Sequence, residues 1–169
     1  SSSGDTSDFG PVLNPHGKRY LAGGSSSGGA AAVATGDCDI AIGGDQGGSV
    51  RTPASWCGVV GLKPTRGLVP YTGVAPVERT TDTVGPLTRS VEDAARTLEV
   101  IAGSDGESHP LDGRQSEHIK PDEYTDAVSS TVDSLTIGVL TEGFDREVSD
   151  PRIDAEVREA IAALEDRGV

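Results

Sequence analysis

The sequence predicts an α/β fold, with a mixed or parallel sheet layered against helices. Two short runs rich in apolar and β-branched residues, 40–42 and 135–140, have the composition of strands. Two segments with helical periodicity, 91–102 and 151–164, alternate with them along the chain, a pattern typical of α/β layering. The 169 residues, 34% of them hydrophobic and 4% aromatic, suffice for one domain whose core is rich in small side chains.

The first half of the chain is organised around glycine. A tight Gly/Ser turn over 23–29 is predicted to lead into a small-residue helix over 30–35, which Gly36 ends. Residues 40–42 are predicted to form a short buried strand that enters a second glycine turn, 43–49. A short helix should follow. It carries Trp56 and Cys57, which we expect in the core or, alternatively, lining a pocket.

The second half has clearer helix signals. Residues 59–89 alternate Gly, Pro and short β-branched runs and are expected to form loops and turns. The helix over 91–102 should begin at Ser90 with a capping box and end at Gly103. An acidic, proline-containing stretch, 104–134, is expected to be a surface excursion.

The last predicted elements are the strand over 135–140 and a second long helix. This helix should be capped by Asp150 and have Pro151 at its first position. Its apolar side chains recur at helical spacing and are expected to form a buried face: Ile153, Val157, Ile161 and Leu164.

Composition excludes several function classes. With 27 acidic and 14 basic residues the net charge is −13, which argues against nucleic acid or an anionic membrane surface as a partner. No apolar run has the length of a membrane span, and the two cysteines, Cys38 and Cys57, lack metal-binding spacing. We therefore expect a cytoplasmic protein with free thiols and no metal or other cofactor. The acidic, lysine-poor composition also suggests adaptation to high salt.

The second glycine turn has the features that acyl transfer needs. A strand ahead of it supplies a rigid support, and Gly47-Gly48-Ser49 can gather backbone N–H groups around one exposed hydroxyl. Phosphate-binding and dinucleotide motifs are absent, as is the GxSxG motif. The three histidines of a possible Ser-His-Asp triad all lie in polar, loop-like contexts: His16, His109 and His118. They are expected to be solvated loop residues.

These motifs together resemble the amidase signature family. The resemblance runs from GPVLNP at residue 10 through GGSS at 23, GDQGGSVRTPA at 44 and GVVGLKPT at 58 to ERTTDTVGP at 78. It covers more than half the chain and looks most like the bacterial amidases that act after nitrile hydration. It implies one partial domain over 1–169, incomplete at both ends, with a mixed sheet flanked by helices. Within it, 10–103 would be the signature core, 104–134 the excursion, and 135–169 a strand plus a helix.

The resemblance also implies a Ser–cis-Ser–Lys hydrolase acting on a small-molecule amide. Ser49 maps to the nucleophile and Ser25 to the bridging serine in a cis peptide, although anchoring on the following glycines would select Ser26 instead. The oxyanion hole would use the N–H groups of Gln46, Gly47, Gly48 and Ser49. Asp45 and Arg51, with Ser26, are expected to support the loop rather than touch substrate.

One catalytic residue of the family has no match. Its lysine base lies upstream of the first turn, whereas Lys18, Lys63 and Lys120 do not fit that role. The chain is therefore interpreted as the central segment of an amidase that could be homo-oligomeric at full length. The alternatives are the transamidating subunit of the glutamyl/aspartyl-tRNA amidotransferase and a non-catalytic, truncated remnant. Gln46 and Glu78-Arg79-Thr80 favour the free amidase.

Overall fold

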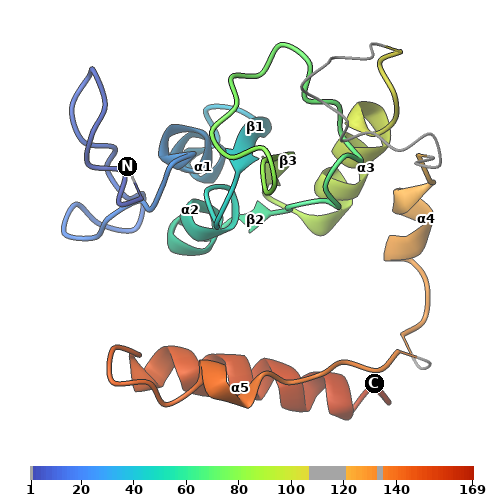
Figure 1. Ribbon diagram of the computed structural model, residues 1–169. Coiled ribbons are helices and arrows are strands. Elements are labelled where there is room, and N and C mark those ends of the chain that lie inside the picture. Colours follow the sequence, from blue (N-terminus) through green and yellow to red (C-terminus); the bar gives the residue numbers. More distant parts are fainter. Residues whose placement is uncertain (1, 107–120, 133–134) are drawn as a thin grey trace. The chain divides into compact units, whose positions relative to one another are not determined.

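The computed structural model describes residues 2–106, 121–132 and 135–169 (Figure 1). The chain divides into two compact units, Ser1–Val128 and Ser129–Val169, each defined by the contacts within it. Each unit is described by itself. His109, His118 and Lys120 lie outside the described residues.

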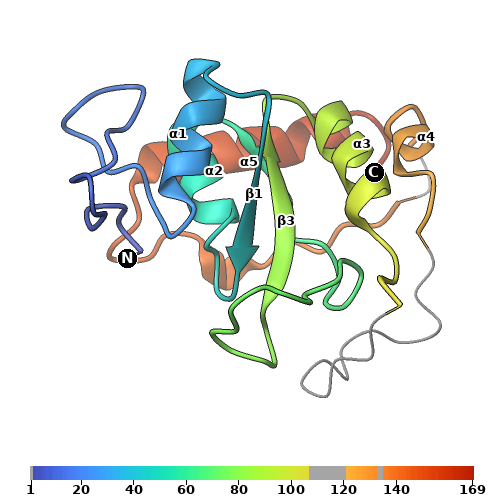
Figure 2. The same cartoon turned by 90° about the horizontal axis from the view of Figure 1, so that it is seen from above.

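The first unit is built on a three-stranded sheet. β3 (Thr83–Thr88) runs between β1 (Ile40–Asp45) and β2 (Val60–Gly61), and both pairings are antiparallel. Figure 2 shows β1 and β3 side by side at the centre of this unit. The predicted α/β class is confirmed, but the pairings among the described strands are antiparallel, whereas a mixed or parallel sheet was expected.

Helices cover both faces of β3, and all six of its residues are buried. Alternate strand residues point to opposite faces. Leu87 joins a cluster with α1 (Ser27–Thr35) and α2 (Arg51–Cys57), and Val84 joins a second cluster with α3 (Val91–Ile101). The core therefore lies in two layers, one on each side of this strand.

Two expectations for the sheet were wrong. Residues 59–89 were expected to hold only loops and turns but contain β2 and β3; Pro86 and Gly85 hid the central strand, since both residues are rare inside strands. The strand over 40–42 was found but is not buried, because Ile40 and Ile42 are 45% and 53% exposed. β1 is an edge strand of the described sheet, and α3 contacts β3 and β2.

The helices of the first unit follow their predicted signals. α1 begins at Ser27, earlier than expected, and ends at Gly36 with a φ of +81°. At α3 the Ser90 hydroxyl accepts the Asp93 N–H at 3.1 Å, as one half of the predicted capping box.

A helix not foreseen in the excursion, α4 (Tyr124–Val128), adjoins α3. The Glu99 carboxylate of α3 accepts both the N–H and the hydroxyl of Thr125, at 2.6 and 2.5 Å. These two bonds lower the pKa of Glu99 below its ordinary value. They also attach α4 to the first unit.

The second unit contains η1 (Thr141–Gly143) and α5 (Pro151–Glu165). Asp150 caps α5 as predicted, accepting the Arg152 N–H at 2.9 Å. The predicted strand over 135–140 is absent: the segment has no ladder partner among the described residues, and a strand needs one. The predicted buried face of α5 was also wrong in part, since Ile153 and Val157 are 62% and 44% exposed. Within the described part of its own unit α5 has no sheet against which to bury them.

Three further properties concern the described residues as a whole. None of their helices is long and apolar enough to cross a membrane. No group of three or more His, Cys, Asp or Glu side chains among them could hold a metal ion. Cys38 and Cys57 are free thiols.

Candidate active site

The two glycine turns meet at one place in the first unit. The Ser26 N–H donates to the Ser49 carbonyl oxygen at 3.0 Å, which joins the start of α1 to the loop before α2. The peptide bond between Gly24 and Ser25 is cis, where the resemblance placed it. Ser49 and Ser26 are half-buried and Ser25 is exposed. The structure thus brings the three predicted serines to the junction of these turns.

Gly43 allows this junction to close. A Cβ atom at this position of β1 would overlap the Ser26 side chain and would lie 3.1 Å from Cγ2 of Val50. The strand end, the first turn and the start of the second helix therefore pack directly on one another. Only glycine leaves room for this approach.

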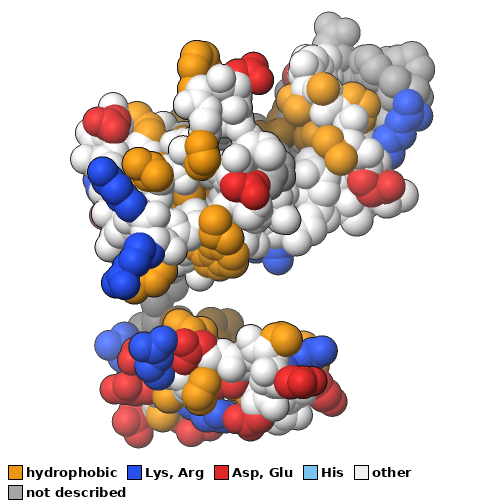
Figure 3. All heavy atoms as spheres, turned by 90° about the vertical axis from the view of Figure 1, so that its left-hand side faces the viewer, with side chains coloured by type: hydrophobic (Ala, Val, Ile, Leu, Met, Phe, Trp, Pro, Cys, Tyr) orange, Lys and Arg blue, Asp and Glu red, His pale blue; other side chains and the backbone are white. Residues whose placement is uncertain are grey.

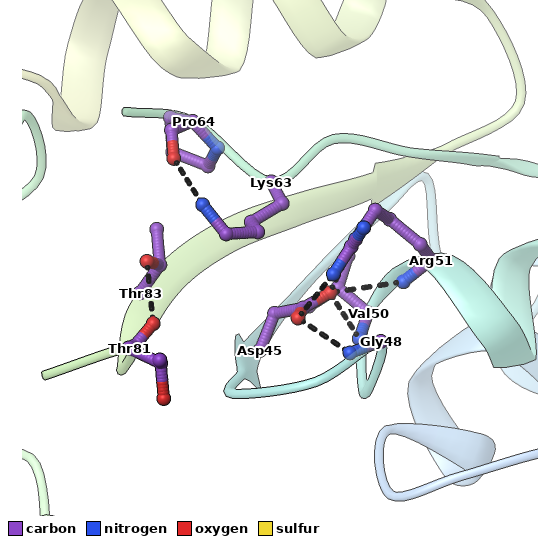
Figure 4. Close-up of polar contacts among 8 residues, drawn as sticks. All are labelled: Asp45, Gly48, Val50, Arg51, Lys63, Pro64, Thr81 and Thr83. Atoms are coloured by element: carbon purple, nitrogen blue, oxygen red, sulfur yellow. Dashed lines mark hydrogen bonds and ion pairs between the residues drawn. The ribbon is translucent and has the colours of Figure 1, made fainter. Parts of the chain in front are cut away.

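Asp45 holds the second turn in shape (Figure 4). Its fully buried carboxylate accepts the backbone N–H groups of Gly48 at 2.7 Å, Val50 at 3.2 Å and Arg51 at 3.4 Å. The Arg51 guanidinium adds two bonds of 3.0 Å through Nε and Nη2. One carboxylate thus joins the end of β1 to the start of α2, around the loop that carries Ser49.

These contacts also set the charge of the carboxylate. Burial alone would raise the pKa of Asp45, but the bonds from Arg51 and from the three N–H groups outweigh it and lower the pKa to about 2. The same pairing raises the pKa of Arg51. Asp45 is therefore a buried anion, and the Arg51 side chain, 52% exposed, lies at the surface beside it.

The loop leaves a smaller set of free donors than predicted. The Gly48 N–H donates its hydrogen bond to the buried Asp45 carboxylate and is therefore not free to bind a substrate oxygen. No described residue accepts the N–H groups of Gln46, Gly47 or Ser49. Backbone donors next to a hydroxyl are the groups that stabilise an oxyanion in acyl transfer.

The lysines do not meet the serines in any described contact. Lys63 donates from Nζ to the carbonyl oxygen of Pro64 at 3.1 Å (Figure 4). Lys18 is exposed on the loop before the first turn. Within the described part of the chain neither side chain is bonded to a serine of the two turns.

Sequence reasoning missed the polar contacts at the other end of α2. The buried Asn14 amide donates to the carbonyl oxygens of Leu21 at 2.8 Å and Trp56 at 2.9 Å. His16 Nε2 lies 2.9 Å from the Cys57 carbonyl oxygen, so this exposed histidine has a partner. Cys57 is buried as expected, and Trp56, 45% exposed, lines a hollow. The Asn14-Pro15 pair was the available signal, since Asn-Pro favours a turn.

Comparisons with known proteins agree on one family. The amidase family model matches residues 1–169. An enantioselective amidase of Rhodococcus rhodochrous is 52% identical over 169 residues, covering 97% of this chain and 31% of its own length. A glutamyl-tRNA(Gln) amidotransferase subunit from Salinibacter ruber (strain DSM 13855 / M31) is 48% identical over 99% of this chain and 31% of its own length.

Solved structures show the same similarity. Native peptide amidase from Stenotrophomonas maltophilia is 42% identical with a TM-score of 0.67, over 75% of this chain and 26% of that one. The chain spans about a third of the length of the curated relatives it matches.

Proposed function

Because this chain belongs to the amidase family, we propose that it supplies the nucleophile loop of an enzyme that hydrolyses carboxamides to carboxylates and ammonia. The observation that carries the proposal is the junction of the two turns. There the Ser26 N–H meets the Ser49 carbonyl, and the Ser49 loop offers the N–H groups of Gln46 and Gly47.

In the proposed reaction, the Ser49 hydroxyl oxygen attacks the amide carbon and its proton passes through Ser25 to a lysine supplied from outside these 169 residues. The tetrahedral oxyanion forms beside the free N–H groups of the loop. The C–N bond then breaks, the nitrogen takes up the proton, and ammonia leaves. Water hydrolyses the resulting ester to carboxylate and restores the Ser49 hydroxyl.

Asp45 and Arg51 act as positioning residues in this scheme. Their five contacts hold the loop from its buried side, so the donors need not reorganise as charge develops on the substrate. Gly48 then serves to shape the turn rather than to bind the oxyanion.

Ser49→Ala in a protein that carries this chain and the lysine-bearing segment tests the proposal. We expect ammonia release from simple aliphatic and aromatic amides to fall by more than about a hundredfold, since losing the nucleophile should exceed the ~10²–10³ cost of losing one oxyanion donor. Ser55→Ala, at an exposed position of α2, is the matched control and should retain activity. Residual turnover above about a hundredth of the parent would overturn the assignment of Ser49.

Transfer of ammonia from glutamine to a second substrate is the second candidate, favoured by the 48% identity to an amidotransferase subunit. The same Ser49 chemistry would release ammonia from glutamine. Comparing glutamine with simple carboxamides as donors separates the two: preferential use of glutamine would favour the amidotransferase.

A further inference from the structure

A hollow of about 350 Å³ lies at the end of α2 opposite Ser49. It is formed by the loop before the first glycine turn together with one residue of α2, and its lining is mostly apolar. The lining residues are Asn14, His16, Arg19, Tyr20, Leu21 and Trp56. Figure 3, which views the molecule from the side of the N-terminal loops, shows hydrophobic and basic side chains next to one another on this face.

The floor of the hollow is held by hydrogen bonds. Asn14 is only 6% exposed, and its amide binds the carbonyl groups of Leu21 and Trp56 at 2.8 and 2.9 Å. The Asn14 Oδ1 accepts the His16 N–H at 2.9 Å, and the His16 ring reaches the Cys57 carbonyl at 2.9 Å. These hydrogen bonds therefore join the loop to the end of α2.

Two of the side chains that line the hollow are aromatic and partly exposed to solvent. Tyr20 is 59% exposed and Trp56 is 45% exposed. Large aromatic surfaces gain free energy when another flat apolar group covers them. Tyr20 and Trp56 therefore offer apolar surfaces against which a planar ring of a ligand can pack.

The hollow also carries a cation that no described carboxylate neutralises. Arg19 has no carboxylate partner among the described residues, although the chain carries 27 acidic side chains. A guanidinium presents paired N–H donors that match the two oxygens of a carboxylate. Five other described arginines have such a partner, namely Arg51, Arg89, Arg96, Arg152 and Arg158. Arg19 differs from the remaining described arginines without one in that it lines the hollow beside two aromatic side chains.

From these observations we propose that the hollow binds small aromatic carboxylates, with the ring against Trp56 and Tyr20 and the carboxylate on Arg19. α2 has seven residues, so the site is about 10 Å along the helix axis from the Ser49 loop. It is a second site, and it does not rest on the proposed hydrolysis.

Trp56 is the single tryptophan of the sequence, so its fluorescence reports directly on the hollow. Phenylacetate, which does not absorb where tryptophan is excited, is titrated into the 169-residue chain, with the indole N–H resonance as a second readout. We expect a saturable change in Trp56 emission, and weaker binding of benzyl alcohol, which keeps the ring without the charge. An emission spectrum and an indole resonance that do not respond up to millimolar phenylacetate would overturn the proposal.

Two variants separate the pocket from general attraction of an anion. Arg19→Gln should weaken phenylacetate binding about tenfold or more, the effect of losing a charge-assisted contact. Lys18→Gln removes the same charge from a neighbouring exposed residue that does not line the hollow, and should leave binding within about twofold. Equal weakening by both variants, or none by Arg19→Gln, would refute the site. Both positions are exposed, and unchanged far-UV circular dichroism verifies their folding.

Discussion

Replacing Asp45 with Asn should lower the free energy of unfolding of the first unit by about 2–4 kcal/mol. The Asp45 carboxylate is fully buried and accepts three backbone N–H groups and two guanidinium bonds. Asn has one acceptor oxygen in place of two, and its NH2 group would face N–H donors. At least two of the five hydrogen bonds to Asp45 are therefore lost. A buried donor left unpaired costs about 1–3 kcal/mol, and the half-exposed Arg51 recovers part of its loss from water.

The pH dependence of the parent protein tests the same contacts. Because the pKa of Asp45 is lowered from 3.8 to about 2, its contribution to stability is complete above about pH 4 and is lost as the pH falls through 2. At about 1.4 kcal/mol for each pH unit between the two values, the contribution is about 2 kcal/mol. Asp45→Asn should remove this acid-sensitive part of the profile.

Urea titrations followed by Trp56 fluorescence, at pH 7 and between about pH 4 and 2, measure both effects in the unit that holds Asp45. Asp150→Asn is the matched control, because the bonds from Arg152 also lower the pKa of Asp150 to about 2, but at an exposed helix cap in the other unit. Asn is an equally good N-cap, so the control should leave the Trp56 transition unchanged. If Asp45→Asn has the stability and the acid profile of the parent, the reasoning fails.

Two further predictions concern packing and the chain by itself. Gly43→Ala should destabilise the first unit by about 1–3 kcal/mol in urea titration, because the added methyl group would overlap the Ser26 side chain. Gly28→Ala is the control and should not destabilise the unit, because a Cβ atom at position 28 would have no neighbour within 4 Å. Equal effects of the two variants would argue against the close approach at Gly43. The 169 residues alone should release no ammonia from carboxamides, and serine-dependent turnover would require Lys18 or Lys63 to be reconsidered as the base. The same chain should fold better in molar salt, where a Debye length of about 3 Å screens the repulsion within its net charge of −13.

Local signals predicted the helices well, and pairing between distant segments was predicted poorly. α3 and α5 have a cap residue, acidic first turns and helical periodicity, all of which lie within a few residues of one another. β3 was missed because its strand character comes from its two neighbours rather than from its Gly85-Pro86 sequence. The opposite error at 135–140 has the same cause: the composition suits a strand, but no described segment pairs with it.

At the site, the sequence indicated candidate residues but not the contacts between them. The resemblance mapped Ser25 to the first glycine turn and Ser49, with Asp45, to the second. That the Gly48 N–H is used by Asp45 depends on the path of the backbone around a buried carboxylate, which no pattern of residue types encodes. The contact of Asn14 with Trp56 spans 42 positions and was likewise beyond local reasoning.

The link between the two turns runs from main chain to main chain, from the Ser26 N–H to the Ser49 carbonyl. Scanning mutagenesis of side chains therefore does not detect this hydrogen bond, because every residue except proline supplies the same backbone N–H at position 26. A library of variants would report tolerance at the very position where the two turns are joined. Replacing the amide at position 26 by an ester, which deletes the donor and retains the serine side chain, is the modification that exposes the link.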